Sequence, residues 1–404
     1  MTESSRLYER RRSMPDMKVT DAMIALIRTV FKDDETLDAE SQDVIRNNTE
    51  EIYKIAKCND MAHLIGYALE KADMISPDNK YFVKLQEQTY LAIFRYEGMA
   101  FELERMREEL ERAEICFIPL KGAVIRSLYP EGWMRTSSDI DILVRPEDIE
   151  RASEVLTSKL GYNLTQESTH DYSFFTEGGI HIELHFDLVE AGRANSASEV
   201  LSDVWKHARA VNGKNFEREL EDGMFYFYHI AHLAKHLEVA GAGMRPVIDL
   251  WLINNRMERD EKSRFELLSR CSLDKFASFC DELAEKWMGE KKEISSQAEK
   301  LGQFILGCGI YGSEENRIII SKGKNGGTFR YILSRLFLPY ETLALLYPII
   351  KKQKWLFPFC QVARWFKLLS GNMAKKAIGE VKMSSSTTAE ELEEMERFMS
   401  EIGL

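Results

Sequence analysis

The chain has 404 residues, of which 44% are hydrophobic and 30% are charged. This balance is typical of folded globular proteins and excludes a chain that is disordered throughout or built like collagen, and the length predicts two or three structural units. Acidic residues outnumber basic residues by 66 to 54, and the resulting net charge of −12 argues against a protein that mainly coats nucleic acid.

We expect a flexible N-terminus over residues 1–18, followed by a helical N-terminal region over residues 19–113. Apolar residues recur in this region at three and four positions, as in Ala22 and Leu26, which is the period of a helix with one buried face. The stretch 81–113 contains no proline and is rich in residues that favour helix, so it is predicted to form one long helix.

Residues 114–190 are predicted to form a small mixed α/β core. The apolar period shortens at residues 114–120 (EICFIPL), where β-favouring side chains appear, and a helical pattern opens at Lys121-Gly122. The run 139–144 alternates acidic and aliphatic side chains, which predicts a second strand. A strand, a tight turn, a short helix and a second strand are therefore expected in this order.

The second half of this core adds a helix and a hairpin. Pro146 suits the first turn of a helix, and Gly161 suits its C-terminal end. Two further alternating runs, residues 171–177 and 180–189, are separated by a Gly-Gly pair and predict a β-hairpin. The predicted fold class is therefore α+β, a small mixed β-sheet core flanked by N-terminal and C-terminal helical regions.

Three regions follow the core: a helical domain (191–320), a basic aromatic helical region (321–382) and a linker with an acidic C-terminal helix (383–404). The region 321–382 contains twelve Lys or Arg against two Glu, in contrast to the acidic remainder. Its interleaved aromatic residues are Trp355, Phe357, Phe359, Trp365 and Phe366. This composition fits peripheral contact with an anionic surface, and it fits equally a helical subdomain with an aromatic core and a solvated basic face.

A set of acidic residues suggests the chemistry. Asp139 and Asp141 are two positions apart on a predicted strand, so their side chains project from the same face. Glu183 lies in a later alternating run, on a face that it shares with His185. If the two strands are neighbours, three carboxylates converge, and their mutual repulsion requires a cation such as Mg²⁺ or Mn²⁺. A D-x-D string alone also arises from solvent-facing acids at a sheet edge, so the residues around it have to distinguish a metal site from an exposed edge.

The predicted turn before the D-x-D strand adds candidate phosphate ligands. Gly122 stands at a strand-to-helix turn, where a glycine lets the backbone approach a phosphate and the helix N-terminus supplies unpaired N–H groups. Lys121 adds a positive charge beside it. Both residues are therefore candidate phosphate ligands.

The order of these residues resembles the polymerase β-like nucleotidyltransferase superfamily, in which a glycine turn follows a strand, a D-x-D lies on the next strand and a third acid lies on a later one. More narrowly, the chain resembles a bacterial family of uncharacterised nucleotidyltransferases. The residues behind this closer resemblance are Leu120-Lys121-Gly122-Ala123, Leu128-Tyr129-Pro130, Arg135, Asp139-Ile140-Asp141-Ile142-Leu143-Val144, Leu160-Gly161-Tyr162 and Ile182-Glu183-Leu184-His185. The resemblance extends to the helix around His232 and Asp249 and to the stretch YPIIKKQKWLFPFCQVARW.

The resemblance implies a metal-dependent nucleotidyltransferase that uses Mg²⁺ or Mn²⁺ and takes an NTP as its substrate. Asp139 and Asp141 would bind the metal ions, and Glu183 would complete the metal site or help to deprotonate the acceptor. The enzyme would move an NMP group to an unidentified hydroxyl or phosphate acceptor, on a small molecule, a saccharide, a protein or an RNA, and would release pyrophosphate.

Further residues are candidates for binding the nucleotide or its phosphates. Arg135 can bind leaving-group phosphates bidentately, although a structural salt bridge to a nearby acid explains it equally well. The superfamily turn is commonly Gly-Gly or Gly-Ser, whereas this chain has Lys-Gly-Ala, so Lys121 and the hydroxyls of Ser137 and Ser138 are candidate substitutes. The remaining candidates of this group are His185, His232 and Lys235.

Two other functions stay open at this point. One is a noncatalytic nucleotide- or anion-binding module that recognises a partner. The other is a metal phosphohydrolase built on His229, His232, His236 and Asp249, although the zinc motif H-E-x-x-H is absent. The cysteines form no C-x-x-C pair and no apolar run is long enough to cross a bilayer, which predicts a cytoplasmic protein with free thiols.

Overall fold

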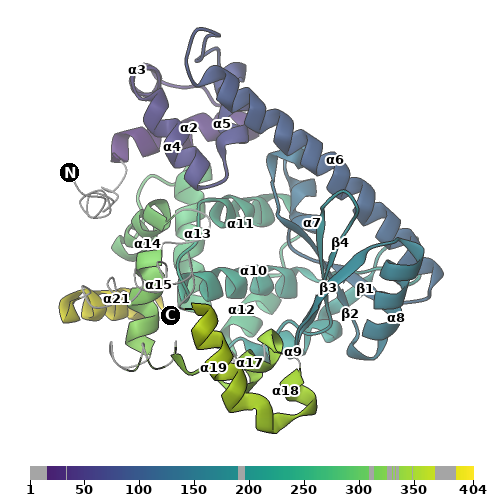
Figure 1. Ribbon diagram of the computed structural model, residues 1–404. Helices are drawn as coiled ribbons and strands as arrows, with labels where there is room; N and C mark the ends of the chain where they lie inside the picture. Colours follow the sequence, from purple (N-terminus) through teal and green to yellow (C-terminus); the bar gives the residue numbers. More distant parts are fainter. Residues whose placement is uncertain are drawn as a thin grey trace. The chain divides into compact units, whose positions relative to one another are not determined.

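The computed structural model divides the chain into two compact units, Met1–Ala234 with Gly243–Ile310 and Lys235–Ala242 with Tyr311–Leu404 (Figure 1). The residues that the structure describes are 16–32, 34–189, 196–308, 314–324, 330, 333, 336–347, 349–368 and 388–404. Most of the N-terminus that we predict as flexible, and the start of the predicted C-terminal linker, therefore lie outside the described residues.

The N-terminal part of the first unit is helical. It contains α2 (Met17–Phe31), α3 (Ala39–Asn47), α4 (Thr49–Cys58), α5 (Ala62–Lys71) and α6 (Phe82–Arg112). Asp16 and Asp38 are the N-caps of α2 and α3, because their side chains accept hydrogen bonds from backbone N–H groups in the first turn of each helix. The single long helix predicted over residues 81–113 is confirmed as α6, which runs from α5 to the neighbourhood of the sheet (Figure 1).

The centre of the first unit is a five-stranded mixed sheet in the order β1-β2-β5-β4-β3. Its strands are β1 (Phe117–Pro119), β2 (Asp139–Val144), β3 (Asn163–Glu167), β4 (Asp171–Phe175) and β5 (His181–His185). The pair β2–β5 is parallel, whereas the other neighbouring strands are antiparallel. The predicted hairpin is present as β4–β5, with Gly179 at φ +78° in its turn. A mixed sheet among helices confirms the α+β class.

Short helical segments connect these strands. The helix α7 (Gly122–Ile125) follows β1, and α8 (Ile149–Glu154) follows β2. A 3₁₀ turn at Pro146–Asp148 precedes α8, and a π-helical turn at Val155–Lys159 extends it. Gly161 then takes φ +74°, so the helical stretch that the sequence predicts between Pro146 and Gly161 ends where expected.

The two faces of the sheet differ in chemistry because side chains alternate along each strand. On one face Ile140, Ile142, Phe174, Ile182 and Leu184 are almost completely buried in a core that includes residues of α6 and α8. The opposite face presents the acidic and imidazole side chains of β2 and β5. The buried face fixes the register of the strands and thereby also fixes the positions of the polar side chains.

The rest of the first unit is mainly helical, as the sequence predicts. Its elements are α9 (Ser198–Ser202), β6 (Ala208–Ala210), β7 (Arg218–Leu220), α10 (Asp222–Leu237) as far as Ala234, α11 (Arg245–Arg256), α12 (Glu261–Ser269), α13 (Asp274–Met288) and α14 (Ser296–Cys308). The strands β6 and β7 form a separate antiparallel pair that the sequence does not reveal, because three residues per strand are too few for a recognisable alternation.

The second unit contains short helices. They are α15 (Glu314–Lys324), α17 (Tyr340–Leu346), α18 (Ile349–Lys352), α19 (Phe357–Leu368) and α21 (Ala389–Ile402). The acidic helix α21 begins with a capping box, in which Thr388 and Glu391 bond to each other's backbone N–H groups. Within the parts of the chain that are described, no helix is both long enough and apolar enough to span a membrane.

The burial of one sheet face predicts unequal effects for two neighbouring phenylalanines. Phe174→Ala removes a completely buried ring and should lower the free energy of unfolding by about 3–5 kcal/mol. Phe175 lies on the opposite face with 39% of its surface exposed, so Phe175→Ala should cost about 1 kcal/mol or less. Urea unfolding of both variants measures the difference, and equal losses would contradict this assignment of faces.

Candidate active site

The three predicted acidic residues lie on one face of the sheet. In the parallel pair β2–β5, Asp139 is opposite His181 and Asp141 is opposite Glu183. Ligand atoms of Asp139, His181 and Glu183 lie within 4.8 Å of one another, and so do those of Asp141, Glu183 and His185. The two strands are thus neighbours, and the carboxylates converge in a carboxylate cluster consisting of Asp139, Asp141 and Glu183.

Asp141 is the most deeply buried member of the carboxylate cluster, with 2% of its side chain exposed. Its Oδ1 accepts hydrogen bonds from Nζ of Lys121 at 2.8 Å and from Nε2 of His185 at 2.9 Å. Burial alone would raise the pKa of Asp141, but the nearby Lys121 and His185 outweigh burial and hold this pKa well below its usual range. The carboxylate therefore stays ionised, and cationic side chains of the protein balance its charge.

Lys121 reaches Asp141 from the turn between β1 and α7. Its backbone has φ +44° and ψ −117°, a conformation that favours glycine and strains a residue with a Cβ. Burial would lower the pKa of the ammonium group, but the carboxylate of Asp141 raises it above its usual value. The ion pair is thus made by a residue whose own backbone is strained.

The turn itself is as tight as the sequence predicts. A Cβ at Gly122 would lie 2.6 Å from Nη1 of Arg135, so any larger residue here would displace that guanidinium. The helix that follows, α7, has only four residues and therefore contributes little dipole to an anion. The positive charge at this turn comes from the side chain of Lys121.

Two hydroxyl groups hold Asp139. Ser137 Oγ donates to Oδ1 at 3.1 Å, and Ser138 Oγ donates to Oδ2 at 3.1 Å. Burial, followed by the charge of Asp141, raises the pKa of Asp139. Ser137 and Ser138 are thus placed beside the carboxylate cluster, and binding of phosphate by their hydroxyls stays a prediction.

Two histidines flank Glu183. His185 Nε2 lies 3.4 Å from Oε2 of Glu183, and His181 Nδ1 lies 4.0 Å from Oε1. The pKa of His185 would be lowered by burial, but its hydrogen bonds to Asp141 and Glu183 raise it to about 9. The set of site residues predicted from the sequence omits His181, although the same alternation that selects Glu183 places His181 on this face.

Arg135 lies in a buried ion pair. Its Nη2 is 3.0 Å from Oδ2 of Asp249 on α11, and the hydroxyl of Tyr129 donates to Oδ1 of Asp249 at 2.8 Å. This is the structural salt bridge that the sequence allows as an alternative to phosphate binding. It ties α11 to the segment between α7 and β2, and any contact of Arg135 with a phosphate stays a prediction.

The histidines of α10 take separate positions. His229 Nε2 is 2.8 Å from the backbone oxygen of Pro246, and burial lowers the pKa of this histidine. The ring of His232 lies 6.2 Å from that of Tyr228, and Lys235 is in the last turn of the helix. The groups of metal-binding side chains found in the described residues lie on the sheet and include none from α10.

Tyr228 is a neighbour of the carboxylate cluster that the sequence does not single out. The phenol is buried, which is the main reason that its pKa is raised. The charges of Asp141 and Glu183 raise this pKa further, and the ammonium of Lys121 opposes them. α10 therefore contributes a buried polar group to the surroundings of the cluster, but no sequence pattern distinguishes this tyrosine from the apolar aromatics beside it.

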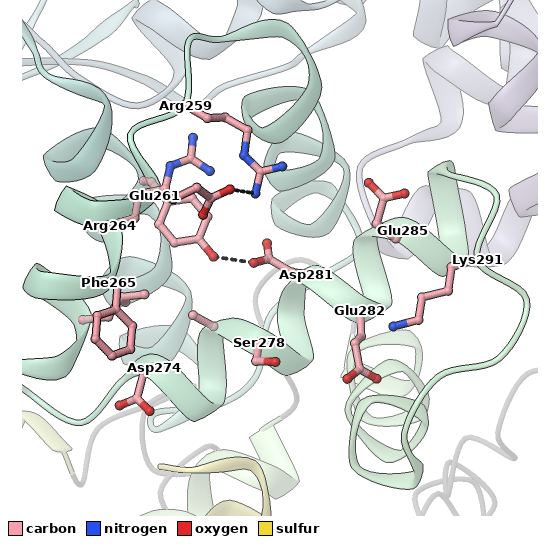
Figure 2. A pocket seen from close by; sticks show the side chains of 13 residues that line it. Arg259, Glu261, Arg264, Phe265, Asp274, Ser278, Asp281, Glu282, Glu285 and Lys291 are labelled. Atoms are coloured by element: carbon pink, nitrogen blue, oxygen red, sulfur yellow. Dashed lines mark hydrogen bonds and ion pairs between the residues drawn. The ribbon is translucent and has the colours of Figure 1, made fainter.

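Two cavities in the first unit lie away from the carboxylate cluster. One of about 400 Å³ is shown in Figure 2, where Arg259 pairs with Glu261 and where Asp281 accepts a hydrogen bond. The other, of about 580 Å³, is lined by residues of α6, α7 and β7. Neither lining includes a residue of the carboxylate cluster, so the side-chain chemistry of the cluster, and not cavity size, defines the candidate site.

The donor set of this site fits a divalent cation. Carboxylate oxygens suit Mg²⁺ and Mn²⁺, and the imidazole of His181 adds a nitrogen donor that Mn²⁺ accepts more readily, whereas His185 would first have to lose the proton that its Nε2 donates to Asp141. His185 Nδ1 is buried and has no hydrogen-bond partner within the described parts of the chain. A cation at Asp141 would have to replace the ammonium of Lys121, which now neutralises that carboxylate.

The raised pKa of His185 predicts a pH-dependent part of the stability of the metal-free protein. Because the folded pKa is about 9 and the ordinary value is 6.5, this contribution is complete below pH 6.5 and is lost as the pH rises through about 9. The wild type should therefore lose about 3 kcal/mol over this range relative to His185→Gln. Urea unfolding with a chelator present measures this loss.

His207→Gln is the matched control for the His185→Gln comparison. His207 is half-buried directly before β6 and belongs to neither of the metal-binding side-chain groups found in the described residues. This variant should follow the pH dependence of the wild type. Parallel stability curves for the wild type and His185→Gln would show that His185 does not have the raised pKa.

Comparison with known proteins identifies the family. A family model described as uncharacterised nucleotidyltransferase matches residues 46–289, which is more than half of the chain. No curated protein and no solved structure matches the sequence. The matched region includes the turn at Lys121, the strands β2 and β5 and the helices α10 and α11. The chain therefore belongs to the family of uncharacterised nucleotidyltransferases.

Proposed function

We propose that the protein transfers an NMP group from an NTP to a hydroxyl or phosphate acceptor, with release of pyrophosphate, in a reaction that depends on a divalent metal ion. Membership of a nucleotidyltransferase family supports the reaction class and implies an NTP substrate. The observation that supports the metal dependence is the convergence of Asp139, Asp141 and Glu183 on one sheet face. The cytoplasmic location expected from the sequence is part of the same proposal.

In this proposal Asp139 and Asp141 hold the metal, Mg²⁺ or Mn²⁺, and Glu183 completes its site. When bound, the ion supplies positive charge that neutralises the phosphates and stabilises the charge that develops during transfer. Ser137 and Ser138 orient the carboxylate of Asp139, because each donates a hydrogen bond to one of its oxygens. The buried face of the sheet keeps the three carboxylates in register.

Glu183 is the residue that we assign to the acceptor. It is less buried than Asp141, with 25% of its side chain exposed, so an incoming hydroxyl can reach it. An acceptor oxygen attacks the α-phosphorus, the bond from this phosphorus to the bridging oxygen breaks, and pyrophosphate leaves. Glu183 accepts the proton of the hydroxyl, whereas a phosphate acceptor has no proton to give up.

Lys121 has two successive partners in this proposal. In the metal-free protein its ammonium neutralises Asp141. If a divalent ion were bound at that carboxylate, the Lys121 ammonium would be available for a phosphate oxygen of the nucleotide beside the Gly122 turn. We propose Arg135 and His185 as further phosphate-binding residues, because a guanidinium can bind phosphates bidentately and His185 lies beside Glu183. We propose His232 and Lys235 as nucleotide-binding residues on the family resemblance.

The first test concerns Asp139. Asp139→Asn removes a charge needed for the metal and should lower nucleotidyl transfer by at least about 100-fold while leaving the fold intact. Asp141→Asn is a less clean test, because it leaves the Lys121 ammonium buried without its partner and should destabilise the protein. Transfer of label from α-phosphate-labelled NTPs to sugar phosphates, RNA or protein, with Mg²⁺ or Mn²⁺, measures activity.

Glu150→Gln is the matched control, since Glu150 is an exposed acid on α8 that bonds to Tyr172 outside the cluster. Its activity should equal that of the wild type. A wild type that binds NTP but releases no pyrophosphate with any acceptor, and whose binding is unchanged in Glu183→Gln, would favour the noncatalytic nucleotide-binding module.

A second test concerns the exchange of cations at Asp141. Lys121→Met removes the ammonium with which a metal ion competes, so it should tighten Mn²⁺ binding in the absence of nucleotide by at least about five-fold. The same variant should weaken NTP binding. Electron paramagnetic resonance of free Mn²⁺ measures the first effect. Lys159→Met, at an exposed lysine, is the control, and unchanged or weaker Mn²⁺ binding in Lys121→Met would contradict the exchange.

A further inference from the structure

The helix α19 and the turn before it present a row of apolar side chains to solvent. Trp355, Phe359, Val362 and Phe366 are 65%, 63%, 42% and 71% exposed. Their spacing of four, three and four positions places them along one side of the helix. We call these four residues the aromatic face. It lies within the second unit, where α17, α18 and α19 occur together (Figure 1).

Other side chains of α19 fix its orientation within the unit. Gln361 Nε2 donates to the backbone oxygen of Leu338 at 2.7 Å, and Trp365 Nε1 donates to that of Leu336 at 2.7 Å. The ring of Trp365 also packs against that of Phe337, with centroids 5.2 Å apart. These contacts hold one side of α19 against residues 336–338, so the aromatic face points outward.

The charged residues in the segment that carries the aromatic face have one sign. Residues 349–368 contain five Lys or Arg and no Asp or Glu, although the whole chain has a net charge of −12. Lys352, Lys354 and Lys367 are exposed. An apolar side flanked by bases is complementary to a surface that is apolar inside and anionic outside.

We propose that the aromatic face binds the surface of a membrane that contains anionic phospholipids. Trp355, Phe359, Val362 and Phe366 enter the boundary between headgroups and acyl chains, while the lysines contact the headgroups. A membrane surface explains the basic charge of the segment. It also explains Val362, whose aliphatic side chain has no ring on which a nucleic-acid base could stack. α19 lies in the plane of the membrane surface and does not cross it.

Binding of the full-length protein to vesicles tests this inference. The wild type should sediment with vesicles of phosphatidylcholine and phosphatidylglycerol, more weakly with phosphatidylcholine alone, and less as salt is added. Phe359→Ser with Phe366→Ser should lower partitioning by at least about ten-fold, since two rings no longer leave water. Lys352→Glu with Lys354→Glu should remove the preference for the anionic vesicles.

Phe94→Ser is the matched control, because Phe94 is 78% exposed but lies on α6 in the first unit. It should bind vesicles as the wild type does. Brominated lipids should quench tryptophan fluorescence in the wild type and less in Trp355→Phe. The inference is overturned if the wild type binds neither vesicle, if the Phe359 and Phe366 changes leave binding unaltered, or if an RNA oligonucleotide competes the protein off the vesicles.

A last outcome of the experiment concerns whether another part of the same chain covers the aromatic face. If the Phe359→Ser and Phe366→Ser changes lower the melting temperature and the wild type does not bind vesicles, the face is an internal contact, and the inference fails. Nucleotidyl transfer should be unchanged in the double variant when it is assayed without lipid. Vesicle binding is measured without nucleotide transfer, so the membrane inference can fail or hold independently of the function proposed for the carboxylate cluster.

Discussion

The balance of charge around Asp141 is the constraint on which the candidate site depends. A carboxylate that is almost completely buried costs several kcal/mol unless cations compensate it, and three carboxylates on one face multiply that cost. Lys121 and His185 provide this compensation through direct hydrogen bonds. With Asp139 and Glu183 included, three formal negative charges meet two positive ones. The cluster therefore keeps a negative charge for a cation while remaining compatible with a stable fold.

Strand pairing explains why residues far apart in sequence share this balance. The parallel pairing of β2 with β5 places Asp141 opposite Glu183, and a shift of one residue would turn every acid toward the apolar core. The aliphatic side chains on the other face prevent such a shift, because they are buried against α6 and α8. The polar site thus owes its geometry to apolar burial on the reverse of the same strands.

Sequence alone could predict the parts of the site that repeat locally. Alternation along residues 139–144 and 180–189 predicted both strands and the faces of their acids, and Lys121-Gly122 predicted the turn. The predicted convergence of the carboxylates depended on β2 and β5 being neighbours. Alternation within each strand could not establish this, since strand pairing is a long-range property. The Arg135–Asp249 ion pair was also beyond local pattern, because it joins residues 114 positions apart. Tyr228 stands in a run of aromatic residues on α10, and no local pattern showed that it lies near the carboxylate cluster.

The strained backbone of Lys121 gains a physical explanation from the same charge balance. At Lys121 the backbone takes a conformation that glycine would adopt without strain, so a lysine there has a cost in free energy. That cost is offset if the side chain makes an interaction that glycine cannot, and the buried ion pair with Asp141 is such an interaction. Glycine at this position would relax the turn but leave Asp141 with His185 as its remaining cationic neighbour. Strain in the turn and charge in the cluster therefore belong to one arrangement, in which the residue with the strained backbone stabilises the buried acid.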